Sequence, residues 1–277
     1  MTRVAPAALT TAAVVHAALV DLSDESKASQ VARYLRAVPG GYGEGDRFMG
    51  VAVPRIRALA KRIRLDHDEL ERLAASPWHE ERMVALCVAV GRAKRIRRLL
   101  DSARSQRDSN SPAVQDALTG REEMGLRYLD WVGRGLVGAW LLLPLVQEAG
   151  DDTVARPQVL PDRMTTLISS DSVWERRVAV LSTFATTRAG VDWPAYAVAR
   201  RLLDDPHDLI RKAIGWMLRE AGKRVDERAL VAFLDEYAPV MPRTMLRCAI
   251  ERFDPAVRAH YRSRTVRTAS RSRVTEP

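Results

Sequence analysis

Three residues on one predicted helix have the types and the spacing that suit contact with a nucleic acid. Residues 208–222 carry apolar side chains at the spacing of an amphipathic helix, and Lys212, Trp216 and Arg219 share one flank of that apolar stripe. Cationic side chains bind phosphate, and an indole ring stacks on a base or a sugar. The alternative is that Trp216 packs at the edge of a contact between helices, as aromatic residues at helical spacing usually do.

Arg177 is a second candidate because it interrupts an apolar helix face, while Arg176 lies to one side of that face. A guanidinium is tolerated there when it is paired, or when it lines a site that a ligand anion enters. The sequence leaves two interpretations open, a buried ion pair with an acid of a neighbouring helix and a phosphate contact. The apolar face consists of Val173, Trp174, Val178, Val180, Leu181 and Phe184.

Helices must position these residues, because nearly every segment has helical patterning and no segment alternates as a strand does. Pro or Asp stands at many predicted helix starts. Short polar turns between helices predict an all-α fold of antiparallel helix pairs, an α-solenoid. The predicted helices cover residues 10–22, 26–37, 54–64, 66–74, 79–91, 96–103, 111–118, 122–132, 136–149, 161–169, 173–189, 194–203, 208–222, 227–237, 242–251 and 255–263.

The composition indicates a globular protein with a polyanionic partner. Of 277 residues 47% are apolar, which is ample for a core, and the formal net charge is +9. This charge suits a nucleic acid or an acidic membrane surface. The most apolar stretch, 136–146, is too short to span a bilayer and contains Pro144. We therefore expect a cytoplasmic protein.

No sequence motif for a metal or a cofactor is present, so we expect neither. Cys87 and Cys248 lie in apolar helical patterns without further ligands at metal-binding spacing, and we expect buried thiols in a reducing compartment. The N-terminal Ala- and Val-rich run resembles an export signal, but His16 interrupts it, and we expect no export.

Three segments depart from the helical pattern. Residues 38–50, VPGGYGEGDRFMG, contain five Gly and one Pro, which predicts a loop with unusual backbone angles that crosses between helices. Residues 101–120 are polar and poorly patterned. The tail after Tyr261 is rich in Arg and has no apolar periodicity, which predicts a disordered basic arm, either simply solvated or adding nonspecific affinity for phosphate.

Several segments resemble the AlkD-like DNA alkylation repair family, glycosylases built from HEAT-like helical repeats. The resemblance covers roughly 15–262, is strongest at 38–54 and 171–253, and is weakest at 101–128. It implies an N-terminal extension at 1–14, a HEAT-like domain at 15–262 and a basic tail at 263–277. The matching segments are DDPHDLIRKAIGWMLREAGKR at 204–224, MPRTMLRCAIERF at 241–253, WERR at 174–177 and PGGYGEGDRFMGV at 39–51, which follows the family's PGxYGEGDxFxGV signature.

The segment GLRYLDWVGRGLVGAW, residues 125–140, also aligns without gaps on a family segment that contains a Trp, the catalytic Asp four residues later, and a Gly eight residues further on. In this register Asp130 takes the place of the acid and Gly138 that of the Gly. Leu126 stands where the family has its Trp, which puts one wall of the expected aromatic cradle in doubt. Helical periodicity by itself places Asp130 on the polar side of its helix.

The resemblance implies that Asp130, Arg177 and Trp216 are the catalytic residues of a DNA glycosylase. Its implied substrate is duplex DNA with cationic N3- or N7-alkylated purines, whose N-glycosidic bond is hydrolysed to leave an abasic site. A monomer without lyase activity, cofactor or metal, associated with the nucleoid through DNA, is expected. Together with these residues, the expected DNA contacts are Lys212, Arg219, Arg176, Arg243 and Arg247.

Two other classes of function stay open at this point. Leu126 favours a non-catalytic protein that binds DNA structure with a degenerate active site, whereas Asp130, Arg177 and Trp216 favour the enzyme. A solenoid scaffold that binds proteins would have no affinity for DNA, and the basic charge disfavours it.

Overall fold

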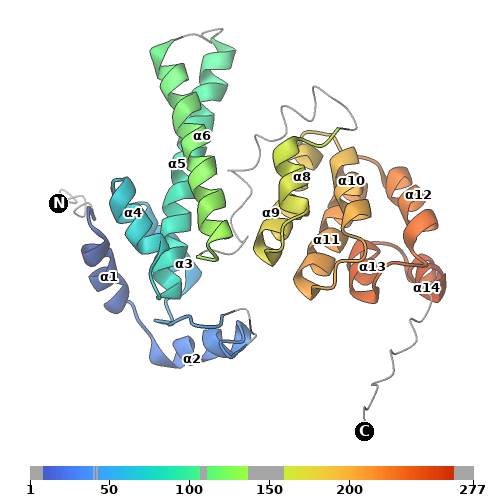
Figure 1. The fold of residues 1–277 in the computed structure, drawn as a ribbon, viewed down its shortest axis with the longest axis horizontal. Coiled ribbons are helices and arrows are strands. Elements are labelled where there is room, and N and C mark those ends of the chain that lie inside the picture. The colour runs from blue at the N-terminus through green and yellow to red at the C-terminus, as the bar shows by residue number, and fades with distance from the viewer. Residues whose placement is uncertain (1–8, 40, 42, 107–110, 137–158, 265–277) are drawn as a thin grey trace, which may run out of the picture. The chain divides into compact units, whose positions relative to one another are not determined.

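The computed structural model describes residues 9–39, 41, 43–106, 111–136 and 159–264. Within them lie thirteen α-helices and no β-sheet, only two isolated bridges, so the predicted all-α class is confirmed (Figure 1). The chain divides into two compact units, Met1–Leu145 and Val146–Pro277, here the N-terminal and the C-terminal unit. In the described part of the chain, no helix has the length and apolar content that crossing a bilayer needs.

The N-terminal unit is organised around its longest helix, α5. Helices α3, α4 and α6 each pack on α5, and α1 packs on both α4 and α5. Asp66 stands at the predicted start of α4 and accepts the backbone N–H of Glu69 at 2.8 Å. The helices are α1 (Ala12–Val20), α2 (Glu25–Tyr34), α3 (Val53–Ala60), α4 (His67–Ala74), α5 (His79–Ser105) and α6 (Pro112–Gly133).

Helices α5 and α6 are each continuous, where the sequence predicted two shorter helices in each place. The predicted gap at 92–95 consists of Arg, Ala, Lys and Arg, which are strong helix formers, and Ala93 is buried. The predicted break near Gly120 is wrong for a tertiary reason, because α6 packs against α5 and a Cβ at Gly120 would lie 3.8 Å from the Ile96 side chain of α5. The end of α5 and the start of α6, which include the described part of the poorly patterned segment 101–120, share a small core. It consists of Leu100, Ala103, Val114 and Ala117, with Ile96 and Leu118 packed against it.

The glycine-rich segment 38–50 is a crossover held by one buried carboxylate. Glu80, 2% exposed, accepts the backbone N–H groups of Met49 and Gly50 at 2.9 and 2.8 Å. Gly50 has a φ of +76°, and a Cβ there would lie 2.1 Å from the carbonyl oxygen of Asp24. The C-terminal half of the segment therefore has a structural function, as predicted for a crossover; residues 40 and 42 lie outside the described part.

The C-terminal unit has two layers of helices. Helices α9, α11 and α13 pack side by side in sequence order, α8 and α10 pack on α9, and α10 and α12 pack on α11 (Figure 1). This arrangement of successive pairs is the one expected of HEAT-like repeats. The helices are α8 (Asp162–Ile168), α9 (Val173–Arg188), α10 (Trp193–Arg201), α11 (Asp208–Arg224), α12 (Glu227–Tyr237), α13 (Arg243–Ala249) and α14 (Pro255–Arg264).

Two glycines let α11 approach its neighbours closely. A Cβ on Gly215 would lie 2.4 Å from the carbonyl oxygen of Met245 in α13, and one on Gly222 would lie 2.5 Å from the Leu230 side chain in α12. Both glycines belong to the segment whose resemblance to the family is strongest. They fix the position of the helix that carries Trp216.

Several of the sequence-based expectations change or stay open. Cys87 and Cys248 are free thiols but only half-buried, not fully buried as predicted, and burial raises the pKa of both. The predicted helix at 136–149, apart from its first residue, lies outside the described part, as do Gly138 and the tail from 265 onward. The division into residues 1–14, 15–262 and 263–277 stays a prediction, although α1 already begins at Ala12.

Candidate DNA-binding surface and active site

Trp216 lies on the flank of α11 predicted from the sequence and is both exposed and packed. The residue is 38% exposed, and its ring centroid is 6.3 Å from that of Phe184 in α9. On the same flank Lys212 forms a surface ion pair with Asp208, and Arg219 pairs with Glu251. The tryptophan thus has a helix–helix contact on one side and a face open to a ligand on the other.

Arg176 and Arg177 both hold the start of α11. Arg176 donates to the carboxylate of Asp205 at 2.7 Å, and the two side chains are only 15% and 3% exposed. It also donates to the carbonyl oxygens of Ser170 and Asp171. Arg177 donates from Nη1 to the carbonyl oxygen of Leu209 at 2.5 Å, in the first turn of α11.

A buried ion pair of the kind considered for Arg177 is therefore formed by its neighbour, Arg176. A guanidinium fixed by a buried carboxylate and two carbonyl groups has a structural function, since removing it would leave Asp205 as an unpaired buried charge. That Arg176 also contacts DNA stays a prediction, and the same holds for the phosphate contact of Arg177.

Asp130 lies near the end of α6, beside a groove of about 770 Å³ within the N-terminal unit. Its side chain is 56% exposed and accepts a hydrogen bond from Arg134 at 3.0 Å, one helical turn further on. Leu126, one turn earlier, is 46% exposed and lines the same groove. The residues that line it are His67, Glu71, Glu123, Leu126, Arg127, Asp130 and Arg134.

Glu71 of α4 links these groups to the core. Its carboxylate accepts hydrogen bonds of 2.6 Å from the indole N–H of Trp131, which is fully buried, and from Arg134. Burial by itself would raise the pKa of Glu71, but these two donors outweigh it and lower the pKa below its ordinary value. Arg134 thus lies between two carboxylates, Glu71 and Asp130, and restricts where the Asp130 carboxylate can be.

We expect Glu71→Gln to lower the free energy of unfolding at pH 7 by about 1 kcal/mol, because it removes the negative charge to which Arg134 and Trp131 donate hydrogen bonds. The loss stays small because the site is partly exposed to solvent. The pKa of Glu71 is lowered on folding, so its contribution is present above the ordinary glutamate pKa and is lost as the pH falls through the lowered value. Urea unfolding at pH 7 and at acid pH measures this. The difference in the free energy of unfolding between native protein and variant should shrink at acid pH. Glu122→Gln, which changes an exposed carboxylate of α6, is the control and should leave the free energy of unfolding at pH 7 nearly unchanged.

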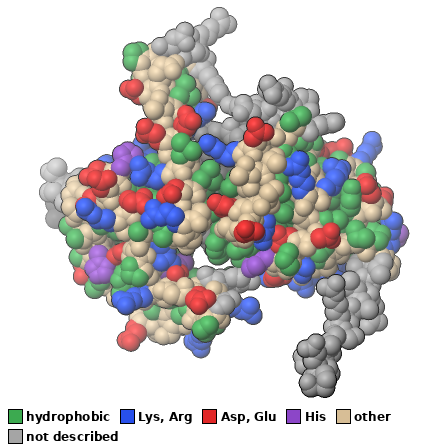
Figure 2. Space-filling model, viewed as in Figure 1, with side chains coloured by type: hydrophobic (Ala, Val, Ile, Leu, Met, Phe, Trp, Pro, Cys, Tyr) green, Lys and Arg blue, Asp and Glu red, His purple; other side chains and the backbone are tan. Residues whose placement is uncertain are grey.

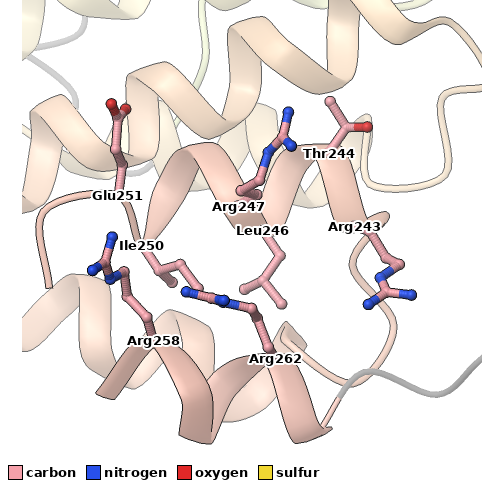
Figure 3. Close-up of a pocket in the computed structure, with 8 residues that line it drawn as sticks. All are labelled: Arg243, Thr244, Leu246, Arg247, Ile250, Glu251, Arg258 and Arg262. Carbon is pink, nitrogen blue, oxygen red and sulfur yellow. The ribbon is translucent and has the colours of Figure 1, made fainter. Parts of the chain in front are cut away.

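Arg243 and Arg247 extend from α13 and line a pocket of about 500 Å³ together with residues of α14 (Figure 3). Both are exposed, as DNA contacts require. Arg258 and Arg262 line the same pocket, and the sequence analysis did not single them out. Their four-residue spacing on one helix was a usable signal, but nothing in the sequence brings that helix to Arg243.

The positive charge is not gathered into one block on the face seen in Figure 2. There, among the described residues, Lys and Arg side chains are interspersed with Asp and Glu over both units. On this face the net charge alone therefore does not mark a binding site.

A model of DNA alkylation repair enzymes matches residues 15–120 and 142–253 of the chain. The chain belongs to this family. The two matched segments include the glycine-rich crossover and, in the C-terminal unit, the segments that carry Arg177 and Trp216, and they confirm the predicted resemblance. They do not include 121–141, where Leu126 and Asp130 lie, so the gapless register there stays a prediction. No individual curated protein matches the chain significantly.

Proposed function

We propose that this repair enzyme is a DNA glycosylase that hydrolyses the N-glycosidic bond of cationic N3- or N7-alkylated purines in duplex DNA. The observation that supports this most directly is the Asp130 carboxylate, which is exposed at a groove and oriented by an arginine that a second carboxylate holds. In this proposal the alkylated base leaves with the bonding electron pair and becomes neutral, so no acid needs to protonate it. The sugar is left with an oxocarbenium-like charge.

Asp130 would stabilise that positive charge and orient the water that attacks the anomeric carbon, and the water's proton passes to the carboxylate or to solvent. Arg177 would bind a backbone phosphate, and the open face of Trp216 would contact the sugar–phosphate backbone or a base. For Arg177 this requires that the guanidinium contact phosphate while Nη1 remains on the Leu209 carbonyl oxygen.

The test is release of 7-methylguanine from a duplex oligonucleotide by the native protein, with abasic sites detected by alkaline cleavage. We expect release without strand cleavage before alkali, because the proposed reaction is simple hydrolysis. Strand cleavage without alkali would contradict the hydrolytic reaction, and the absence of release from both methylated and bulky adducts would contradict the enzyme.

Leu126→Trp tests whether the departure from the family's pattern widens the site. Leu126 is 46% exposed at the groove, and a smaller apolar side chain leaves room for a larger adduct. We expect the substitution to slow release of a bulky purine adduct severalfold more than release of a methylated one. Single-turnover rates on the two oligonucleotides measure this, and equal effects on both would contradict it.

A non-catalytic protein that binds DNA structure is the second candidate. Leu126 at the place of the family's Trp, and a family match that omits 121–141, are the observations that favour it. It predicts DNA binding by the native protein and by Asp130→Asn alike, with no base released by either.

A further inference from the structure

The pocket between α13 and α14 has four arginines around it and one acidic residue. Figure 3 shows Arg258 and Arg262 extending from α14 toward α13, which carries Arg243 and Leu246; Arg247 extends away from α14, at the rim. The volume is about 500 Å³. The lining residues are Arg243, Thr244, Leu246, Arg247, Ile250, Glu251, Arg258 and Arg262.

These arginines are available to a ligand. Within the described part of the chain none of the four has a hydrogen-bond or ion-pair partner for its side chain, and the one acid, Glu251, is already bound by Arg219 of α11. The Nε–H of Arg258 is buried and has no partner at all in that part. A buried donor without a partner is unfavourable, and an anion in the pocket would supply the missing acceptor.

The wall of the pocket strengthens its attraction for an anion. Leu246 and Ile250 are 2% and 1% exposed and present apolar surface beside the guanidinium groups. A low local dielectric increases the attraction between the arginines and a negative charge. Arginine also matches phosphate geometry by donating two parallel hydrogen bonds.

We propose that this pocket binds a phosphate group of the DNA backbone and anchors the duplex at the end of the C-terminal unit. That the phosphate comes from DNA rests on the proposed function; that the pocket binds phosphate rests on the four arginines. The site extends the predicted contacts of Arg243 and Arg247 by Arg258 and Arg262, and makes α14 part of the DNA-binding surface.

The test compares Arg258→Gln/Arg262→Gln with Arg188→Gln/Arg228→Gln, two exposed arginines of the same unit outside the pocket. Both double variants lose two charges. For undamaged duplex DNA, log affinity falls linearly with log salt, with a slope of about 0.9 per phosphate contact. We expect the pocket variant to lower that slope by about one contact and the control to leave it within error. Arg243→Gln, across the pocket on α13, should lower it in the same direction, and thermal unfolding shows whether each variant is folded.

Equal slopes for the pocket and control variants would overturn the proposal. Titration with inorganic phosphate at constant ionic strength identifies the source: stoichiometric phosphate binding by native protein, lost in the pocket variant while the DNA slopes stay equal, would replace DNA by a small phosphate ligand. If the native protein releases no alkylated base but the pocket variant lowers the salt slope as expected, the proposed glycosylase activity is contradicted and the phosphate site stands. If the native protein releases base and the pocket and control variants have equal slopes, the glycosylase stands and the phosphate site is contradicted.

Discussion

Asp130→Asn should slow release of 7-methylguanine by about 10²–10³-fold, the loss seen when one preorganised electrostatic group is removed from an active site. The substitution keeps the size of the side chain and removes the charge that would face the developing oxocarbenium ion. Asp130 is 56% exposed, so the fold should not depend on it. Single-turnover base release and DNA affinity are the two measurements.

Binding of duplex DNA should be equal or slightly tighter in this variant, since one negative charge is lost. Asp116→Asn is the matched control, because Asp116 is exposed on the same helix and does not line the groove. Equal rates of base release for native protein and Asp130→Asn would contradict the proposed role of Asp130. They would also contradict the gapless alignment of residues 125–140 that assigns this role.

Gly50→Ala should destabilise the N-terminal unit by about 3 kcal/mol or more. Two effects combine: a φ of +76° costs a residue with a Cβ about 1–2 kcal/mol, and the Cβ would meet the Asp24 carbonyl oxygen at 2.1 Å and the Ala28 nitrogen at 2.5 Å. Both contacts are with backbone atoms, one in the N-cap of α2 and one in α2 itself. Backbone atoms within a helix cannot move away from the added Cβ as the end of a flexible side chain can. Urea unfolding followed by far-UV circular dichroism measures the change.

Gly45→Ala separates these two effects. Gly45 has nearly the same φ, +77°, but a Cβ there would meet nothing within 4 Å. We expect this variant to lose only the conformational part, about 1–2 kcal/mol. Equal losses at the two positions would show that the close approach of Gly50 to α2 carries no cost.

Helix periodicity and end signals predicted most of the described helices, because both are local. Residues 227–237 were predicted with the observed bounds, and Asp66 caps α4 as its position before an apolar pattern implied. The flank shared by Lys212, Trp216 and Arg219 also follows from spacing alone, as does the interruption of an apolar face by Arg177. The same reasoning failed at two places: it missed the strong helix formers at 92–95 in α5, and it could not see that α6 continues through Gly120 because it packs on α5.

Partners separated by many residues depended on the tertiary structure. The sequence left a buried ion pair and a phosphate contact open for Arg177, and it is Arg176 that pairs with the buried carboxylate of Asp205, 29 residues away. Glu71 lies 60 residues before Trp131, and no pattern in either helix indicates that the carboxylate binds the indole and Arg134. The sequence by itself determined the helices, the family and which residues could do chemistry. The tertiary structure decided which charges are paired and which, like Arg258 and Arg262, are left to a ligand, because pairing depends on how helices pack and not on the spacing within one.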